Sequence, residues 1–91
     1  MYKVKEYCLY LSKIKITLRK SILDPQGKAV HHAVESLKIP YVHDVRIGKY
    51  IEMQVDCPDR AEAERVTQQA CQKLLANPVM EDFSFTIEQL S

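Results

Sequence analysis

The stretch VHDVRIGKYIEMQVD, residues 42–56, decides the fold that we expect for this chain. Apolar side chains occupy alternate positions on both sides of Gly48-Lys49, a period typical of strands with one buried face. A two-residue loop with glycine first favours a type II′ turn, because glycine adopts positive φ without strain. The stretch therefore predicts a β-hairpin that turns at Gly48-Lys49. Its apolar face, which helices must cover, consists of Val45, Ile47, Ile51, Met53 and Val55.

The residues before this hairpin predict one strand and one helix. Residues 13–19, KIKITLR, alternate in the manner of a strand. Asp24 followed by Pro25 is a strong helix start, since aspartate caps free N–H groups and proline loses no hydrogen bond at the first helical position. We expect this helix to reach about residue 38. Its apolar stripe consists of Ala29, Val30, Ala33, Val34 and Leu37.

The residues after the hairpin predict a second helix and a last strand. Asp59 with Glu62 resembles a capping box, which begins a helix over about residues 60–75. Asn77 and Pro78 end this helix, because proline cannot continue it. Residues 83–88 then alternate between apolar and polar side chains, as a strand does.

The expected order of elements is therefore β-α-β-β-α-β, and the expected fold class is α+β. Right-handed crossovers place both helices on one face of an antiparallel sheet, which is the ferredoxin-like sandwich. The other face of the sheet stays bare. We expect residues 13–91 to form this single domain and residues 1–12 to be an N-terminal extension or an extra strand.

The composition limits the possible partners. The chain has 91 residues and a net charge of +1 from 13 basic and 12 acidic side chains. This balance argues against nucleic-acid or anionic-membrane binding, which needs surplus positive charge. The longest apolar runs are too short to span a bilayer. Three cysteines far apart, without a CxxC motif, are best explained as reduced thiols of a cytoplasmic protein.

The sequence carries no motif of a self-sufficient enzyme. GxGxxG, Walker A, GxSxG and HExxH patterns are absent, and two glycines are too few for a glycine-rich phosphate loop. His31 and His32 are adjacent and diverge by roughly 100° on a helix, so they cannot chelate one metal ion together. We therefore expect neither a catalytic nor a metal site.

Three segments resemble the PurS-type small subunit of phosphoribosylformylglycinamidine synthase. They are LDPQGKAV (23–30), VHDVRIGKYIEM (42–53) and KLLANPVMEDFSF (73–85), in the order and spacing of that family. The resemblance covers about residues 13–90, and residues 1–12 are additional to it. It implies a PurS-like α+β fold.

The resemblance also implies a role. The complex makes formylglycinamidine ribonucleotide from formylglycinamide ribonucleotide, glutamine and ATP in purine biosynthesis. A glutaminase subunit releases ammonia, and a synthetase subunit binds ATP with Mg²⁺ and the ribonucleotide. The small subunit is non-catalytic, carries no cofactor, dimerises, and holds the other two together for ammonia transfer.

A regulatory ligand-binding module of the ACT type is the alternative, because ACT domains share the β-α-β-β-α-β order. They bind amino acids at dimer interfaces and lack the three segments in this combination. An amino acid that raised the melting temperature would favour the ACT alternative, since a ligand that binds only the folded state stabilises it.

We expect partner contacts at the hairpin tip and at the start of the first helix. Arginine and tyrosine often anchor interfaces, and a helix N-terminus attracts acidic groups. The candidates are Arg46, Lys49 and Tyr50 at the tip and Asp24, Gln26 and Lys28 at the helix start. Structural roles are expected for Gly48, Pro25, Asn77 and Pro78. The bare sheet face and open sheet edges predict a homodimer or a dimer of dimers.

Overall fold

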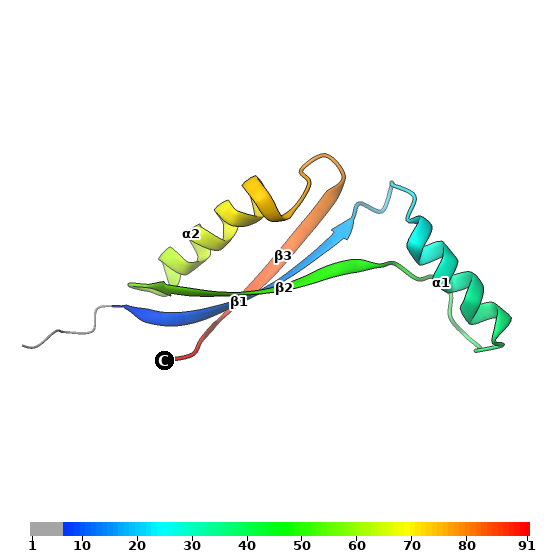
Figure 1. The fold of residues 1–91 in the computed structure, drawn as a ribbon, viewed down its shortest axis with the longest axis horizontal. Helices are drawn as coiled ribbons and strands as arrows, with labels where there is room; N and C mark the ends of the chain where they lie inside the picture. Colours follow the sequence, from blue (N-terminus) through cyan, green and yellow to red (C-terminus); the bar gives the residue numbers. More distant parts are fainter. Residues whose placement is uncertain (1–6) are drawn as a thin grey trace, which may run out of the picture.

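The structure, a computed structural model, describes residues 7–91, and this part of the chain forms three strands and two α-helices (Figure 1). In chain order they are β1 (Cys8–Leu18), α1 (Pro25–Ser36), β2 (Gly48–Cys57), α2 (Arg60–Ala70) and β3 (Glu81–Gln89), with a π-helical turn, η1 (Cys71–Leu75), that continues α2.

The three strands form one antiparallel sheet in the order β2-β1-β3. In the central strand, Ile14 lies opposite Ile51 on β2 and Phe85 on β3. The alternation in β1 therefore extends across the sheet and gives it one mainly apolar face. The expected α+β class and antiparallel sheet are confirmed.

Helix α2 covers the apolar face of the sheet. Asp59 caps its start by accepting a hydrogen bond from the Glu62 amide at 2.9 Å, as the capping-box pattern predicted. One buried polar contact joins the helix to the sheet, a 2.6 Å hydrogen bond between the hydroxyls of Ser12 and Thr67. The core around it includes Tyr10, Ile14, Ile16, Val55, Ala63, Cys71 and Ile87.

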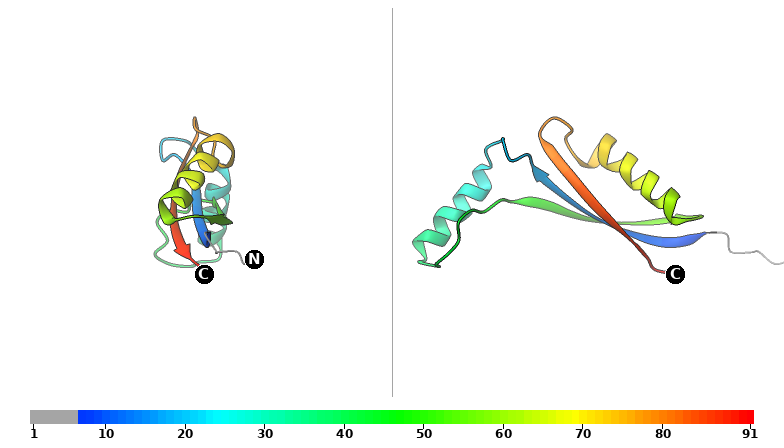
Figure 2. Two further views of the ribbon diagram at one scale, coloured as in Figure 1. Left: turned by 90° about the vertical axis from the view of Figure 1, so that its left-hand side faces the viewer. Right: turned by 180° about the vertical axis from the view of Figure 1, so that it is seen from behind.

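Helix α1 lies beyond the end of the sheet (Figures 1 and 2). The chain is consequently elongated, with extents of 67 × 28 × 15 Å and a radius of gyration of 18.2 Å. A compact domain of this length has a radius of gyration of about 12 Å. The expectation that both helices cover one sheet face is therefore wrong.

The connectivity of the strands explains why the two helices differ. Strands β1 and β2 are antiparallel neighbours, so the connection through α1 leaves and returns at the same end of the sheet. Strands β2 and β3 run parallel to each other on either side of β1, and the connection through α2 must cross over the sheet to join them. Only α2 is forced by the connectivity to pack on the sheet.

The predicted hairpin at Gly48-Lys49 is also wrong. Gly48 begins β2, which pairs along its length with β1, so residues 42–47 are not its partner strand. Neither glycine has positive φ, which excludes the type II′ turn. The expected structural role of Gly48 has another cause, since a Cβ there would lie 2.6 Å from the Ile16 carbonyl oxygen on the adjacent strand.

The N-terminal residues differ from expectation as well. Residues 8–12 are the first part of β1 and continue without a break into the strand predicted from residue 13. They are therefore not a separate extra strand. Of the rest of the expected extension, Tyr7 is exposed and precedes β1, and residues 1–6 lie outside the described residues, so an N-terminal extension stays a prediction.

Candidate partner-binding surface

Residues 24–47, here called the α1 arm, form a unit of their own in which residues 42–47 run beside α1. Asp24 caps the helix, with its Oδ1 accepting a hydrogen bond from the Gly27 amide at 3.0 Å. Its Oδ2 accepts a second one from the Ile47 amide at 2.7 Å. His31 adds a third link, since its Nε2 lies 3.1 Å from the Val42 carbonyl oxygen.

These contacts lower the pKa of the Asp24 carboxyl below its ordinary value of 3.8. The main cause is the hydrogen bond from the Gly27 amide, followed by the one from Ile47, and the charge of Arg46 acts in the same direction. All three favour the carboxylate form. Asp24 is only 5% exposed, so its side chain serves contacts within the arm and offers little surface to a partner.

Arg46 joins the α1 arm to the end of the sheet. Its guanidinium donates hydrogen bonds to the carbonyl oxygens of Leu18 at 3.1 Å and Arg19 at 2.9 Å. These are the residues at which the chain leaves β1. Arg46 is solvent-exposed, so it can still contact a partner, but its Nη2 already donates to two acceptors within the chain.

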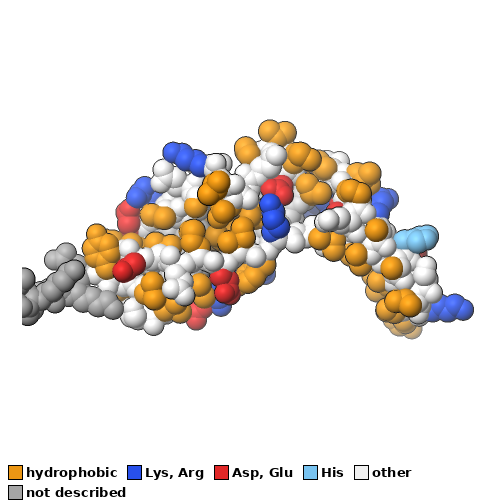
Figure 3. Space-filling view, in the orientation of Figure 1, with side chains coloured by type: hydrophobic (Ala, Val, Ile, Leu, Met, Phe, Trp, Pro, Cys, Tyr) orange, Lys and Arg blue, Asp and Glu red, His pale blue; other side chains and the backbone are white. Residues whose placement is uncertain are grey.

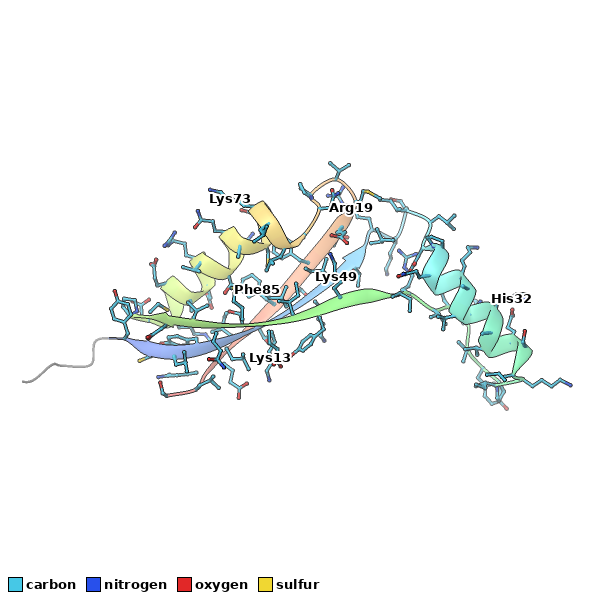
Figure 4. The ribbon with its side chains drawn as sticks, in the orientation of Figure 1. Lys13, Arg19, His32, Lys49, Lys73 and Phe85 are labelled. Carbon is cyan, nitrogen blue, oxygen red and sulfur yellow. The ribbon has the colours of Figure 1, made fainter. Side chains whose placement is uncertain are left out.

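Lys49 and Tyr50 point to opposite faces of the sheet and do not form the expected cluster with Arg46. Lys49 lies on the α2 side, with its Nζ 3.7 Å from Oε2 of Glu81, and Lys13 lies on the other side (Figure 4). Tyr50 is on the face away from α2, where its hydroxyl donates a 3.0 Å hydrogen bond to Glu52. Burial is the main cause that raises the pKa of Tyr50.

The remaining predicted residues are at helix ends. Gln26 and Lys28 are exposed in the first turn of α1, and Pro25 is its first residue, as expected. Asn77 follows η1, and its side-chain oxygen accepts a hydrogen bond from the Val79 amide at 2.9 Å in the turn before β3. The carbonyl of Pro78 accepts a 2.7 Å hydrogen bond from Arg19, which connects this turn to the end of β1.

The sequence patterns predicted the apolar stripe of α1 but not its exposure. Val30 is 42% exposed, Leu37 is 72% exposed, and the nearby Tyr41 is fully exposed. Figure 3 shows hydrophobic side chains on the surface of the α1 end of the molecule. A second exposed apolar group, Leu74, Val79 and Met80, lies where η1 turns toward β3. Helical periodicity identified the α1 stripe correctly, but it could not show that the described residues leave Val30 and Leu37 exposed.

The described residues offer no cluster of three or more metal-ligating side chains. His32 points away from the rest of the chain (Figure 4). Burial raises the pKa of the Cys57 and Cys71 thiols, which keeps them protonated and poorly nucleophilic. No α-helix in this part of the chain is long and apolar enough to cross a membrane.

Comparisons with known proteins agree with the sequence resemblance. The model of the family described as "PurS: Phosphoribosylformylglycinamidine (FGAM) synthase" matches residues 11–89. The PurS subunit of Bacillus subtilis is 43% identical over 90 residues, which cover 99% of this chain and 96% of that protein. The PurS subunit of Synechocystis is 44% identical over 81 residues, 89% of this chain and 81% of that protein.

Solved structures share the fold. The PurS structure from Thermus thermophilus superposes with a TM-score of 0.82 at 38% identity, covering 91% of this chain and 99% of that one. A chain in the structure of PurLQS from Thermotoga maritima gives a TM-score of 0.80 at 28% identity, covering 90% and 98%. These matches favour the PurS resemblance over the ACT-type alternative. The chain belongs to the PurS family, the small subunits of the phosphoribosylformylglycinamidine synthase complex of purine biosynthesis.

Proposed function

We propose that this chain acts in the cytoplasm as a non-catalytic homodimer that holds the glutaminase and synthetase subunits of the complex together, so that ammonia passes between them. The exposed apolar stripe of the α1 arm is the observation that carries this proposal. The structure titled PurLQS from Thermotoga maritima supports an assembly with two other kinds of subunit.

The elongated shape supports a second copy as the occupant of the stripe. A helix of 12 residues gains little stability from propensity alone and depends on packing of its apolar face. The chain also has an uncovered hollow of about 250 Å³ near the end of the sheet, lined by Leu18, Ile47 and Lys49 among others. Since each copy offers both an apolar helix and an uncovered end of the sheet, two copies can cover each other reciprocally about a two-fold axis.

In this proposal the chain uses separate surfaces for its second copy and for the other two kinds of subunit. If the α1 stripe is covered by the second copy, the residues that remain for the other subunits include Tyr50 on the face away from α2 and the exposed group at Leu74, Val79 and Met80. Gln26 and Lys28 stay candidates at the base of the arm. ATP and Mg²⁺ belong to the partner synthetase in this proposal.

Co-purification of this chain with the synthetase and glutaminase subunits of its own organism tests the proposal. Tagged protein should retain both subunits when glutamine, ATP and Mg²⁺ are present, and the mixture should form formylglycinamidine ribonucleotide from glutamine. Without this chain, the synthetase and glutaminase subunits together should form less product from glutamine, while product formation from added ammonia should persist. Full glutamine-dependent turnover without this chain would contradict the proposal.

A further inference from the structure

Both helices begin with an aspartate cap, but the two aspartates have different surroundings. Asp59 is exposed, and its side chain accepts a hydrogen bond from the Glu62 amide at the start of its own helix. Asp24 is buried and uses one oxygen for its own helix and the other for the Ile47 amide, which lies 23 residues further along the chain. Capping alone does not require the second bond.

The Ile47 amide stands immediately before β2, where the chain re-enters the sheet. Arg46, the residue before it, binds the carbonyl oxygens at which the chain leaves β1. The two chain segments that connect the α1 arm to the sheet are therefore tied together by Arg46, and the returning segment is tied to the helix start by Asp24. Without these ties, the arm would be attached through two single-chain connections, which permit hinge motion.

We propose that Asp24 and Arg46 form a latch that sets the direction of the α1 arm relative to the sheet and thereby prepares the arm for docking on a second copy. This proposal rests on the proposed homodimer for its consequence, although the latch itself lies within one chain. An arm held in its docked direction before association loses less conformational freedom on binding, and that raises affinity without any new contact.

The start of α1 and residues 42–47 lie close together, which supports a fixed geometry of the arm. A Cβ on Gly27 would clash with the Val45 carbonyl oxygen, so the backbone of the helix start and that of residues 42–47 approach closely. Asp24 and Gly27 thus act at the same point, one by a hydrogen bond and the other by the absence of a side chain. Both are positioning residues, because their contacts lie within the arm and fix its geometry.

Replacement of Asp24 by serine should remove the hydrogen bond to the Ile47 amide and keep the helix cap at the Gly27 amide. Serine caps helices about as well as aspartate, but its shorter side chain cannot serve both the Gly27 and Ile47 amides. Asp24→Ser should leave the far-UV helicity unchanged, raise the hydrogen-exchange rate of the Ile47 amide, and weaken the dimer roughly tenfold or more in sedimentation equilibrium. Asp59→Ser, the matched control, should change neither the Ile47 exchange rate nor the dimer constant.

Asp24→Asn provides a second variant of nearly the same size, in case serine leaves a cavity that unfolds the chain. One end of the asparagine amide is a donor, so either the Gly27 or the Ile47 amide must lose its acceptor. Equal dimer constants for both Asp24 variants and the Asp59 control would overturn the proposal, even if Ile47 exchanged faster.

The homodimer and the latch can fail separately. A parent protein that stays monomeric at all concentrations would refute the homodimer alone. The latch would then be tested by measuring residual dipolar couplings of the backbone amides. In the parent, the couplings of α1 and of the sheet should fit one alignment tensor, as expected for a rigid connection. Couplings of α1 that are equally large in Asp24→Ser would show that Asp24 does not set the direction of the arm.

Discussion

At the residue scale, Gly27 shows how a close contact outweighs helix propensity. Glycine is unfavourable within a helix by roughly 1 kcal/mol relative to alanine. Gly27 nevertheless occupies the first turn of α1 and is buried there. The position has no room for a side chain, because the Val45 carbonyl oxygen and the Asp24 carboxylate both lie within 3.0 Å of where a Cβ would stand.

Gly27→Ala should therefore destabilise the protein by about 1–3 kcal/mol, as overpacking does, although alanine is the better helix former. Chemical denaturation at a fixed protein concentration measures the change. Lys28→Ala, at the next and exposed position of the same turn, should alter the free energy of unfolding by less than about 0.5 kcal/mol. A stabilised Gly27→Ala variant would show that the backbone contact is looser than described.

The lowered pKa of Asp24 predicts a pH dependence. The pKa of this carboxyl is lower in the folded protein than its ordinary value of 3.8, so the ionised group contributes stability above pH 3.8. The contribution is lost as the pH falls through and below 3.8. The difference in free energy of unfolding between the parent and Asp24→Asn should thus be largest near neutral pH and shrink in acid. A difference that did not change with pH would mean that the charge of Asp24 is not what stabilises the arm.

At the element scale, the two helices are held by different kinds of contact. Helix α2 is held by the apolar face of the sheet and by one buried pair of hydroxyls, Ser12 and Thr67. Helix α1 is held by hydrogen bonds between its side chains or cap and the backbone of residues 42–47, and Val30 and Leu37 of its apolar stripe stay exposed. The sheet thus buries the apolar side of α2, whereas no such layer of described residues covers Val30 and Leu37.

Thr67→Val should destabilise the packing of α2 on β1. Valine has the shape of threonine but leaves the buried Ser12 hydroxyl without its partner, which costs about 1–3 kcal/mol. Adding Ser12→Ala to Thr67→Val should recover part of this loss, because the unsatisfied hydroxyl is then removed as well. Thermal and urea unfolding of the single and double variants measure the coupling. Strictly additive losses would mean that the hydroxyl pair contributes no net stability.

At the scale of the whole molecule, the elongated shape leaves apolar surface uncovered. A radius of gyration of 18.2 Å indicates that much of the α1 arm is not covered by the other described residues. Among the described residues, the most exposed large apolar side chains are Tyr41 and Leu37 in this arm and Leu74 and Val79 between α2 and β3. Large exposed apolar patches mark interaction sites, and two such patches fit a subunit with more than one partner.

Leu37→Glu should convert the protein into monomers by placing a charge in the apolar stripe. Sedimentation velocity at micromolar concentration would detect the fall to the mass of one chain, while circular dichroism checks that the sheet remains. Leu74→Glu is the matched control, since Leu74 is 79% exposed, lies in η1 rather than in the α1 arm, and should not affect the dimer. A dimeric Leu37→Glu variant would place the second copy on another surface.

The sequence by itself determined the local features of this protein. Alternation identified the apolar positions of β1 and β3, and the aspartates at 24 and 59 marked both helix starts, because caps and periods depend on near neighbours. The three family segments identified the PurS family. The same reasoning correctly assigned an apolar stripe to α1.

Only the tertiary structure decided which strands pair and what covers each helix. Alternation in residues 42–56 is equally compatible with two short strands and with one long strand that pairs elsewhere, since the period does not name a partner. Pairing of β2 with β1 removed the hairpin, placed Lys49 and Tyr50 on opposite faces and turned Asp24 and Arg46 toward their own chain. It also left α1 off the sheet, because antiparallel neighbours can be joined without crossing the sheet.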